Sequence, residues 1–260
     1  MSTHEGFGDV GVSVRPDRVA RVEIRRPPNN FFDVALIRSL ADAYESLADG
    51  DRCRAIVLCS QGKHFCAGAD FGGSSDSPAR DAPASLYGEA VRLFRAPLPV
   101  VAAVQGAAVG GGLGLCCSAD FRVAAPEARF AANFAQLGFH HGFALSVTLP
   151  AIVGRQNALD LLYTGRRVSG TEALSMGLCD RLVDADELPA AAHDLAAGIA
   201  ASAPLAVRSI RATMRTGLVD GVAAAMEHEA AEQDRLRRTA DFAEGVSAMA
   251  ERRRPAFEGR

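Results

Sequence analysis

The stretch VGGGLGLCCSADF, residues 109–121, places three consecutive glycines directly before small residues with helical spacing. Glycine leaves the backbone N–H groups uncovered, and the N–H groups of a first helical turn have no partner within the helix. Such a turn can bind a negatively charged oxygen at the positive end of the helix dipole. Close packing of the helix against a strand is the alternative role for the same glycines.

Other chemistries of glycine-rich or short catalytic motifs do not fit this chain. A dinucleotide fingerprint needs a third glycine where Leu115 stands, and a P-loop needs Lys followed by Ser or Thr after the last glycine. The chain has no G-x-S-x-G motif, and HEAAE at residues 228–232 lacks the second histidine of a zinc protease. Anion binding and close helix–strand packing therefore remain as the two possible roles of the glycine run.

A second turn of small residues precedes the glycine run. In HFCAGADF, residues 64–71, the turn Ala67-Gly68-Ala69 follows another apolar segment. Two such turns at the ends of neighbouring strands could each direct one N–H group at the same oxygen. That arrangement would be an oxyanion hole, which stabilises negative charge on a carbonyl oxygen.

The segments GKHFCAGADF and PVVAAVQGAAVGGGLGLCCSADFRVAA, in this order, resemble the crotonase superfamily, also called the enoyl-CoA hydratase/isomerase family. SGTEALSMGLCDRLV and the C-terminal FAEGVSAMAERRRPAFEGR resemble later segments of that family, so the resemblance covers nearly the whole chain. It implies an α/β fold, a crotonase-like spiral of ββα units with a helical C-terminal region. It also implies an acyl-CoA thioester as ligand, an enolate-like intermediate, and a homotrimer or dimer of trimers.

The resemblance further implies which residues form the site. The N–H groups of Ala69 and Gly111 would hold the thioester oxygen. Coenzyme A would be part of the substrate, with no separate cofactor, and Arg252–Arg254 would either meet its phosphates or form a solvated tail. The substrate and its coenzyme A would be bound by Arg26, Pro28, His64, Ala67, Asp70, Phe71, Gly110 and Phe134.

The chain departs from the family at both catalytic glutamates. Gly114 and Phe134 stand at those two positions, and residues 131–142 contain no Asp or Glu that a shifted alignment could use. Hydration needs a group that activates water and a group that delivers the α-proton. Loss of such a group costs about 10²–10⁴-fold in rate. Standard enoyl-CoA hydration is therefore not expected.

His140 and His141 lie in the same segment and are the candidate replacements, because histidine transfers protons near neutral pH. His141 is the preferred candidate, and a structural histidine pair is the alternative. Three functions stay open. The chain is an acyl-CoA lyase or isomerase with another acid/base set, a low-activity enoyl-CoA hydratase or isomerase using histidine or water, or a catalytically silent acyl-CoA-binding subunit.

Composition sets further expectations. A formal net charge of −3 over 260 residues gives no basic excess, so nucleic acid is not an expected partner. The chain shows no signal-peptide pattern and no apolar stretch of membrane-spanning length, which predicts a cytoplasmic protein without membrane contact. Six cysteines without a C-x-x-C pair or a histidine at metal-ligand spacing predict buried thiols and no metal site.

Periodicity predicts the elements that carry the turns. Residues 12–26 alternate around Pro16-Asp17 as a hairpin, and residues 33–50 have helical spacing with Asp33 as N-cap. Apolar runs predict buried strands at 53–60, 99–106 and 120–125, and a helix is expected at 85–95. From residue 146 the chain is mostly helical, with a strand-like segment at 180–184. We predict a crotonase core with the acyl-CoA site over residues 1–200 and a helical trimerisation region over residues 201–260.

Overall fold

The computed structural model describes residues 3–70 and 83–260. Its larger sheet has the strand order β1-β2-β3-β4-β5-β7-β10. Strands β1 to β3 are antiparallel, and β3, β4, β5, β7 and β10 are parallel. The hairpin and the three buried strands are confirmed, whereas β1 was not predicted. The bounds are β1 (Thr3–Phe7), β2 (Val10–Val14), β3 (Val19–Ile24), β4 (Ala55–Ser60), β5 (Val100–Val104), β7 (Phe121–Ala124) and β10 (Arg181–Leu182).

A smaller sheet has the order β6 (Ala107–Val109), β8 (Arg129–Ala131) and β9 (Arg167–Ser169). Strands β5 and β6 follow one another in sequence but belong to different sheets, and the same holds for β7 and β8. Helix α3 (Gly111–Ser118) follows the first pair, and α4 (Leu145–Val153) follows the second after a short 3₁₀ helix, η2 (Ala135–Leu137). This repetition is the ββα architecture that the resemblance implied.

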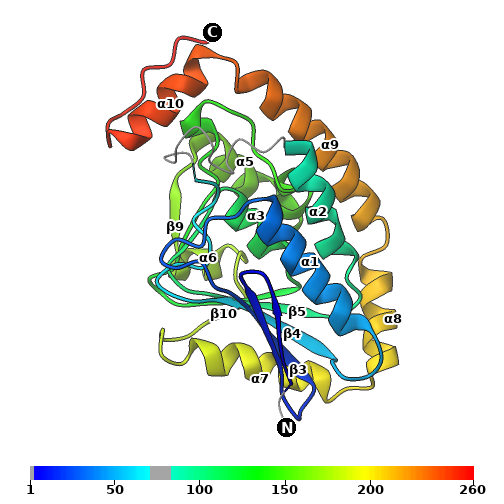
Figure 1. Cartoon of the computed structure of the whole chain (residues 1–260). Helices are drawn as coiled ribbons and strands as arrows, with labels where there is room; N and C mark the ends of the chain where they lie inside the picture. Colours follow the sequence, from blue (N-terminus) through cyan, green and yellow to red (C-terminus); the bar gives the residue numbers. More distant parts are fainter. Residues whose placement is uncertain (1–2, 71–82) are drawn as a thin grey trace.

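The sheet is covered by helices on both faces (Figure 1). Helix α7 (Leu188–Ala200) contacts β4, β5 and β7 on one face, while α1 (Val34–Ala48), α2 (Pro83–Arg95) and α9 (Leu218–Leu236) lie on the other. Alternate residues of β4 therefore enter different hydrophobic clusters: Ile56 packs in the main core and Val57 packs under α7. A strand buried on both faces must be apolar throughout, which explains its continuous apolar run.

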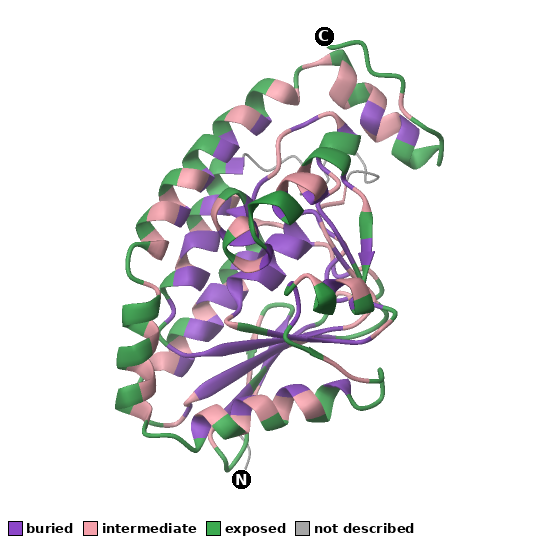
Figure 2. Cartoon of the chain, turned by 180° about the vertical axis from the view of Figure 1, so that it is seen from behind, coloured by how far each residue is buried: buried purple, intermediate pink, exposed green. Residues whose placement is uncertain are grey.

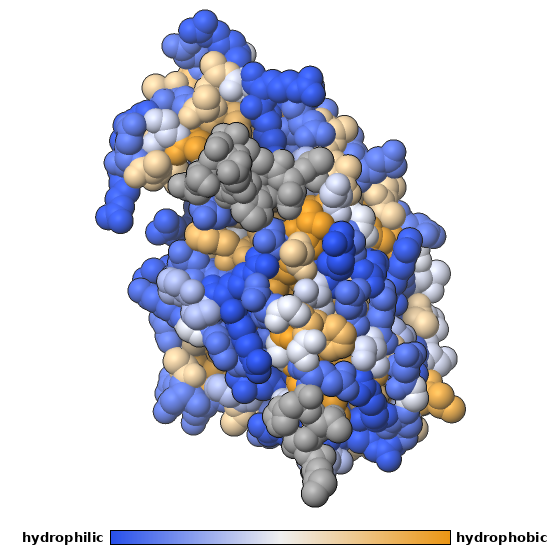
Figure 3. Space-filling model, viewed as in Figure 1, coloured by the Kyte–Doolittle hydropathy of each residue, from blue (hydrophilic) through white to orange (hydrophobic). Residues whose placement is uncertain are grey.

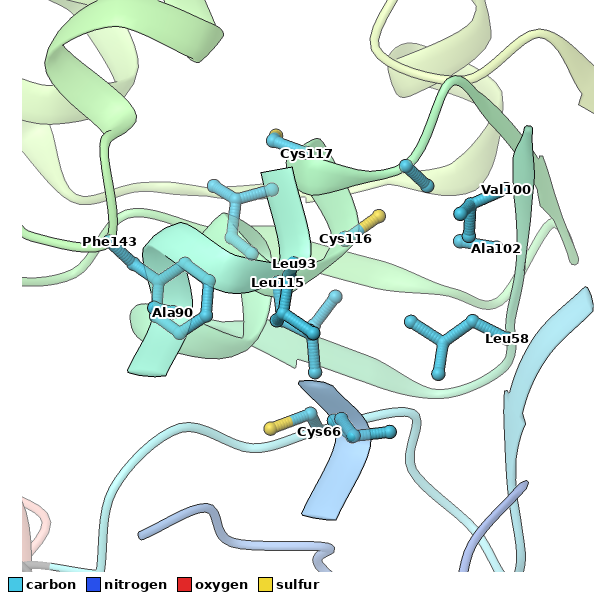
Figure 4. Packing of buried hydrophobic residues seen from close by; sticks show 14 of the residues in the cluster. Leu58, Cys66, Ala90, Leu93, Val100, Ala102, Leu115, Cys116, Cys117 and Phe143 are labelled. Carbon is cyan, nitrogen blue, oxygen red and sulfur yellow. The ribbon is translucent and has the colours of Figure 1, made fainter. Parts of the chain in front are cut away.

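Helix α1 forms as its sequence predicts. The Asp33 carboxylate accepts a hydrogen bond from the N–H of Leu36 at 2.7 Å, which caps the helix N-terminus. Leu36, Leu40 and Leu47 are buried on its inner face, as the spacing requires. Figure 2 shows the same alternation of buried and exposed positions along the outer helices. Figure 4 shows part of the main core, with Leu93, Leu115 and Phe143 among its buried residues.

The chain after residue 154 is mostly helical, and several of its helices pack against earlier elements. Besides α7, it contains α5 (Arg155–Thr164), α6 (Gly170–Ser175), α8 (Pro204–Met214), α9 and α10 (Ala240–Ala250). Helix α9 packs against α2 and α4, and α10 packs against η2. A β-carbon built on Gly245 would lie 2.5 Å from the carbonyl carbon of Leu137, so α10 approaches η2 backbone to backbone.

All six cysteines are free thiols, and all except the half-buried Cys59 are buried.

In the described part of the chain, no individual helix has the length and apolarity to cross a bilayer. Helices α7 and α8 pass that test only as a pair, and the pair is bent by 103°. On the face shown in Figure 3, hydrophobic patches are small and interrupted by hydrophilic residues.

Candidate functional site

The two turns of small residues lie side by side. Cys66 and Ala108 form a parallel bridge, in which the N–H of Cys66 donates to the carbonyl of Ala107 at 2.9 Å. The N–H of Val109 donates to the carbonyl of Cys66 at 3.1 Å. A β-carbon on Gly112 would lie 2.9 Å from the carbonyl carbon of Cys66, so packing between the turns requires glycine at 112.

The glycines at positions 110 and 111 are explained by different structural features. Gly110 has φ 57° and ψ −123°, a conformation that glycine adopts readily, and it precedes the first residue of α3. A β-carbon on Gly111 would lie 2.5 Å from Cε1 of Phe32, so a phenyl ring covers this residue. Packing thus explains part of the glycine run. Within residues 3–70 and 83–260, the N–H groups of Ala69 and Gly111 have no hydrogen-bond partner.

Both turns form the wall of a cavity of about 200 Å³. Ala67, Gly68, Ala69, Gly110 and Gly111 all line it. The other described residues that line this cavity are mostly apolar and include Phe31, Phe32, Phe134, Leu137, Phe139 and Met249. Polar side chains reach it from Asp70, Tyr87, Asn133, Gln233 and Arg237. The structure therefore brings the two predicted oxyanion residues to one cavity.

No carboxylate stands at either expected catalytic position. Gly114 is buried in α3, and a β-carbon there would lie 2.9 Å from both Cγ and the carbonyl oxygen of Phe143, and closer still to its Cβ. Phe134 lines the cavity, and its ring centroid is 5.4 Å from that of Phe139. Among the described residues that line the cavity, the acidic side chain is Asp70.

His140 and His141 lie next to the cavity wall rather than in it. Neither is among its described lining residues, and the His141 ring meets Phe134 edge-on at 6.5 Å. Nε2 of His141 is 2.8 Å from Oγ of Ser146. Because that hydroxyl donates to Glu229 at 2.6 Å, it must accept from His141, which assigns the proton to Nε2.

The His141 ring is kept neutral by its surroundings. Burial, together with the neighbouring His140 and His228, lowers the pKa of His141 to about 4. The two adjacent rings are stacked with their centroids 4.1 Å apart. At neutral pH His141 can therefore accept a proton only at Nδ1, and Phe134 lies beside it at the cavity wall.

Glu229 is a fully buried carboxylate that the sequence did not indicate. Besides the Ser146 hydroxyl, it accepts the N–H groups of Ala144 at 2.8 Å and Ser146 at 3.0 Å. Burial raises the pKa of this carboxyl. The contacts fix the start of α4 and the loop that carries both histidines. Glu229 lies among other charged residues of α9, so its sequence neighbourhood gives no sign of burial.

The predicted coenzyme A residues divide into two groups. Arg26 forms ion pairs with Asp9 at 2.6 Å and Asp33 at 2.8 Å. Nδ1 of His64 accepts the N–H of Ala107 at 3.1 Å, and burial lowers the pKa of this imidazole. These residues and the exposed Pro28 are not among the described lining residues, whereas Ala67, Asp70, Gly110 and Phe134 are; Phe71 lies outside the described residues.

The basic tail residue Arg253 is engaged within the chain. It pairs with Glu244 at 2.8 Å and with Glu251 at 2.6 Å, and all three side chains are partly or largely exposed. Arg253 therefore contributes to a local ion-pair cluster at the end of α10.

Among the described lining residues of the cavity, sequence reasoning missed four polar ones, Tyr87, Asn133, Gln233 and Arg237. The Tyr87 hydroxyl donates to Oε1 of Gln233 at 3.0 Å, and Nε2 of Gln233 donates to the carbonyl of His140 at 3.0 Å. Tyr87 comes from α2 and Gln233 from α9. No local pattern connects two residues so far apart in sequence.

Comparison with known proteins agrees with this architecture. Residues 15–260 match the family model described as enoyl-CoA hydratase/isomerase. The chain is 34% identical to an enoyl-CoA isomerase/hydratase of Zymoseptoria tritici, covering 92% of this chain and 83% of the relative. It is 32% identical to carnitinyl-CoA dehydratase of Proteus mirabilis, covering 93% and 95%.

Solved structures give the same result. An enoyl-CoA hydratase/isomerase from Pseudoalteromonas atlantica superimposes with a TM-score of 0.85 at 33% identity, covering 96% of this chain and 100% of that one. An enoyl-CoA hydratase from Mycobacterium avium subsp. paratuberculosis gives 0.84 at 28% identity, with 97% and 100% covered. The predicted crotonase-like fold is confirmed.

Proposed function

Because the chain belongs to the enoyl-CoA hydratase/isomerase family, we propose that it binds an acyl-CoA thioester and polarises the thioester carbonyl with the N–H groups of Ala69 and Gly111. The observation that carries this proposal is that both residues line one cavity and neither N–H group has a partner among the described residues. Gly111 also begins α3, so the helix dipole favours negative charge there. Each donor is worth about 3 kcal/mol in the transition state.

The reaction itself is an enolate-forming lyase or isomerase step that does not use the family's pair of glutamates. Gly114 carries no carboxylate, Phe143 fills the space beside it, and Phe134 presents a phenyl ring to the cavity. Two groups are left as candidates for proton transfer. Asp70 is the described carboxylate that lines the cavity, and His141 lies behind Phe134 with Nδ1 as its basic atom.

A low-activity hydratase or isomerase that uses histidine or water would employ the same oxyanion donors. A catalytically silent acyl-CoA-binding subunit is the second candidate. The observation that favours it is the replacement of both glutamates by Gly114 and Phe134, which leaves thioester binding possible without an obvious proton carrier.

Coenzyme A enters this proposal as part of the substrate, without a separate cofactor. Ala67, Asp70, Gly110 and Phe134 support it as wall residues, whereas Arg26, Pro28 and His64 would meet coenzyme A outside the described cavity. We also propose a homotrimer or dimer of trimers in the cytoplasm. The assembly is supported by α8, none of whose residues is buried and which exposes Leu205, Ile210 and Met214.

The test removes one donor without changing the side chain. Replacing the amide before Ala69 by an ester, through incorporation of lactic acid at that position, deletes the N–H group alone. Turnover of the thioester substrate found in a panel should fall about 10²–10³-fold. The same replacement at Ala240, the exposed first residue of α10, is the matched control and should leave turnover unchanged.

The panel of CoA thioesters separates the candidate functions. Binding with turnover supports the enzyme, and Asp70→Asn and His141→Ala then identify which group transfers the proton. Binding without turnover on every thioester supports the silent subunit. Absence of binding to any thioester contradicts the proposal as a whole.

A further inference from the structure

The side chain of Asn133 lines the cavity beside the glycine run. Strands β6 and β8 are parallel, and Val109 and Ala131 are their last paired residues. The ends of the two strands therefore lie side by side, and the N–H of Gly110 donates to the carbonyl of Ala131 at 2.8 Å. Because Asn133 follows β8 by two residues, strand pairing places it next to the turn that begins α3.

The amide of Asn133 faces this turn. A β-carbon on Gly110 would lie 3.5 Å from Oδ1 of Asn133 and 3.8 Å from Cζ of Phe134. Gly110 directly precedes Gly111, which is one of the two proposed donors to the thioester oxygen. A group that binds the Asn133 amide therefore lies near the thioester end of the acyl group.

The Asn133 amide has no hydrogen-bond partner within residues 3–70 and 83–260. It is also not among the described side-chain groups that are both unpartnered and sealed from solvent, so the amide is open to the cavity that it lines. The other neutral polar side chains of the described wall, Tyr87 and Gln233, differ in this respect. Their hydrogen bond to each other is 3.0 Å long.

An open amide in mostly apolar surroundings discriminates between ligands. In a free protein, water satisfies such a group. A hydrocarbon chain that displaces the water leaves the amide without a partner, which lowers affinity, whereas a ligand with its own donor and acceptor replaces the lost bonds. An amide offers both a donor and an acceptor, and so does a hydroxyl group.

We propose that Asn133 is a specificity-determining residue whose amide binds a hydroxyl group on the acyl chain of the substrate. The hydroxyl is on the first or second carbon beyond the thioester carbon, because the amide faces Gly110 and the thioester oxygen lies at Gly111. This inference rests on the proposed function, which supplies the position of the thioester. The neighbouring Phe134 ring keeps the hydrogen bond in apolar surroundings, where it is stronger than in water.

The experiment compares three thioesters of equal chain length by isothermal titration calorimetry. Racemic 2-hydroxybutyryl-CoA and racemic 3-hydroxybutyryl-CoA are each compared with butyryl-CoA. At least one hydroxylated thioester should bind the wild-type protein about tenfold more tightly than butyryl-CoA, as expected for a hydrogen bond that is otherwise left unmade.

Replacing the amide tests whether Asn133 causes the preference. Asn133→Leu keeps a side chain of similar shape without donor or acceptor. In this variant the preference should fall below about twofold, while butyryl-CoA binds as tightly as before or more tightly. A purely structural role of Asn133 would weaken all three thioesters together and leave their ratio unchanged.

Two further variants support the comparison. Gln156→Leu removes an exposed amide on α5, outside the described cavity wall, and should leave the hydroxyl preference intact. Asn133→Ala removes the same amide with a smaller side chain and serves if Asn133→Leu does not fold. The expected loss of preference is the same for both Asn133 variants.

The outcomes distinguish this inference from the proposed function. Binding of butyryl-CoA to the wild-type protein with no gain from either hydroxyl overturns the inference alone. Absence of binding by all three thioesters overturns both. A hydroxyl preference that persists in Asn133→Leu or Asn133→Ala assigns the hydroxyl to another group and overturns the role of Asn133.

Discussion

Gly114 and Phe143 share one space in the core: a β-carbon on Gly114 would lie 2.9 Å from Cγ of Phe143, whose side chain is fully buried. The absence of a side chain at position 114 is therefore accompanied by side-chain and backbone atoms of Phe143 in the volume that any β-carbon would need. The ring also packs edge-on against Phe32 at 5.8 Å and Tyr87 at 6.5 Å, both cavity residues.

The first prediction follows from this overlap. Gly114→Ala should lower the free energy of unfolding by about 1–3 kcal/mol, because the added methyl group overpacks the core. The matched control is Gly221→Ala in α9, where a β-carbon would meet nothing within 4 Å. That change should be neutral or stabilise by up to about 1 kcal/mol, since alanine favours helix more than glycine does. Urea unfolding measures both, and equal effects at the two sites would contradict the predicted overlap.

Restoring the two carboxylates requires a third change. Gly114→Glu with Phe134→Glu should give a destabilised protein that hydrates crotonyl-CoA no faster than wild type, because the Phe143 side chain occupies the new side chain's space. Adding Phe143→Gly removes the side-chain part of this overlap at a residue whose φ of 60° suits glycine, so that only its carbonyl oxygen has to shift. Hydration should then exceed wild type by about 10² or more.

The coupled spectrophotometric assay of crotonyl-CoA hydration checks this series. Phe134→Glu with Phe143→Gly, which lacks the glutamate at 114, is its control. Hydration by the wild-type protein at ordinary enzymatic rates would show that the missing glutamates are not needed.

The lowered pKa of His141 predicts that the free energy of unfolding depends on pH. Its pKa is lowered from 6.5 to about 4 in the folded protein, so between these values the unfolded chain binds more protons at this residue. The contribution is fully present above pH 6.5, falls as the pH drops, and is lost near pH 4. It corresponds to about 3 kcal/mol.

Urea unfolding of wild type and His141→Asn between pH 4 and 7 measures this contribution. The stability difference between the two proteins should change with pH in the stated direction. His193→Asn on α7 controls for the loss of a histidine elsewhere. Parallel curves for wild type and His141→Asn would show that the imidazole does not lose its proton on folding.

The close packing of helix α10 against η2 should depend on Gly245. A β-carbon there would lie 2.5 Å from the carbonyl carbon of Leu137, while Met249 of the same helix lines the cavity. Gly245→Ala should push α10 away from η2 and expose the cavity to solvent. Limited proteolysis should then cut α10 faster, and thioester binding should weaken. Gly198→Ala in α7 has open space around the new methyl group and should change neither measurement.

The exposed face of α8 should carry the proposed assembly. Ile210 is 63% exposed and Met214 is 80% exposed, and both border an apolar groove with Phe121. Ile210→Glu should convert the assembly to monomers, because it places a charge in an interface that would otherwise be apolar. Size-exclusion chromatography with light scattering measures the mass. Gln156→Glu, on the exposed side of α5, should keep the wild-type mass.

The sequence by itself determined helix α1, the buried strands of the larger sheet and the two turns of small residues. The Asp33 cap and the spacing of Leu36, Leu40 and Leu47 define α1, and apolar runs define the buried strands. These features are local, because capping and periodicity depend on residues within one or two turns of each other. The glycine run was also legible from its spacing, whereas the missing glutamates at 114 and 134 were legible only through the resemblance to the family.

Only the tertiary structure decided what surrounds those turns. Tyr87 meets Gln233 across 146 residues of chain, and Glu229 meets Ser146 across 83. Phe143 fills the space beside Gly114, and Arg237 enters the cavity from a helix assigned by sequence to the trimerisation region. Such contacts depend on how all the elements pack together. No periodicity within α2 or α9 encodes which residue of one helix will face a given residue of the other.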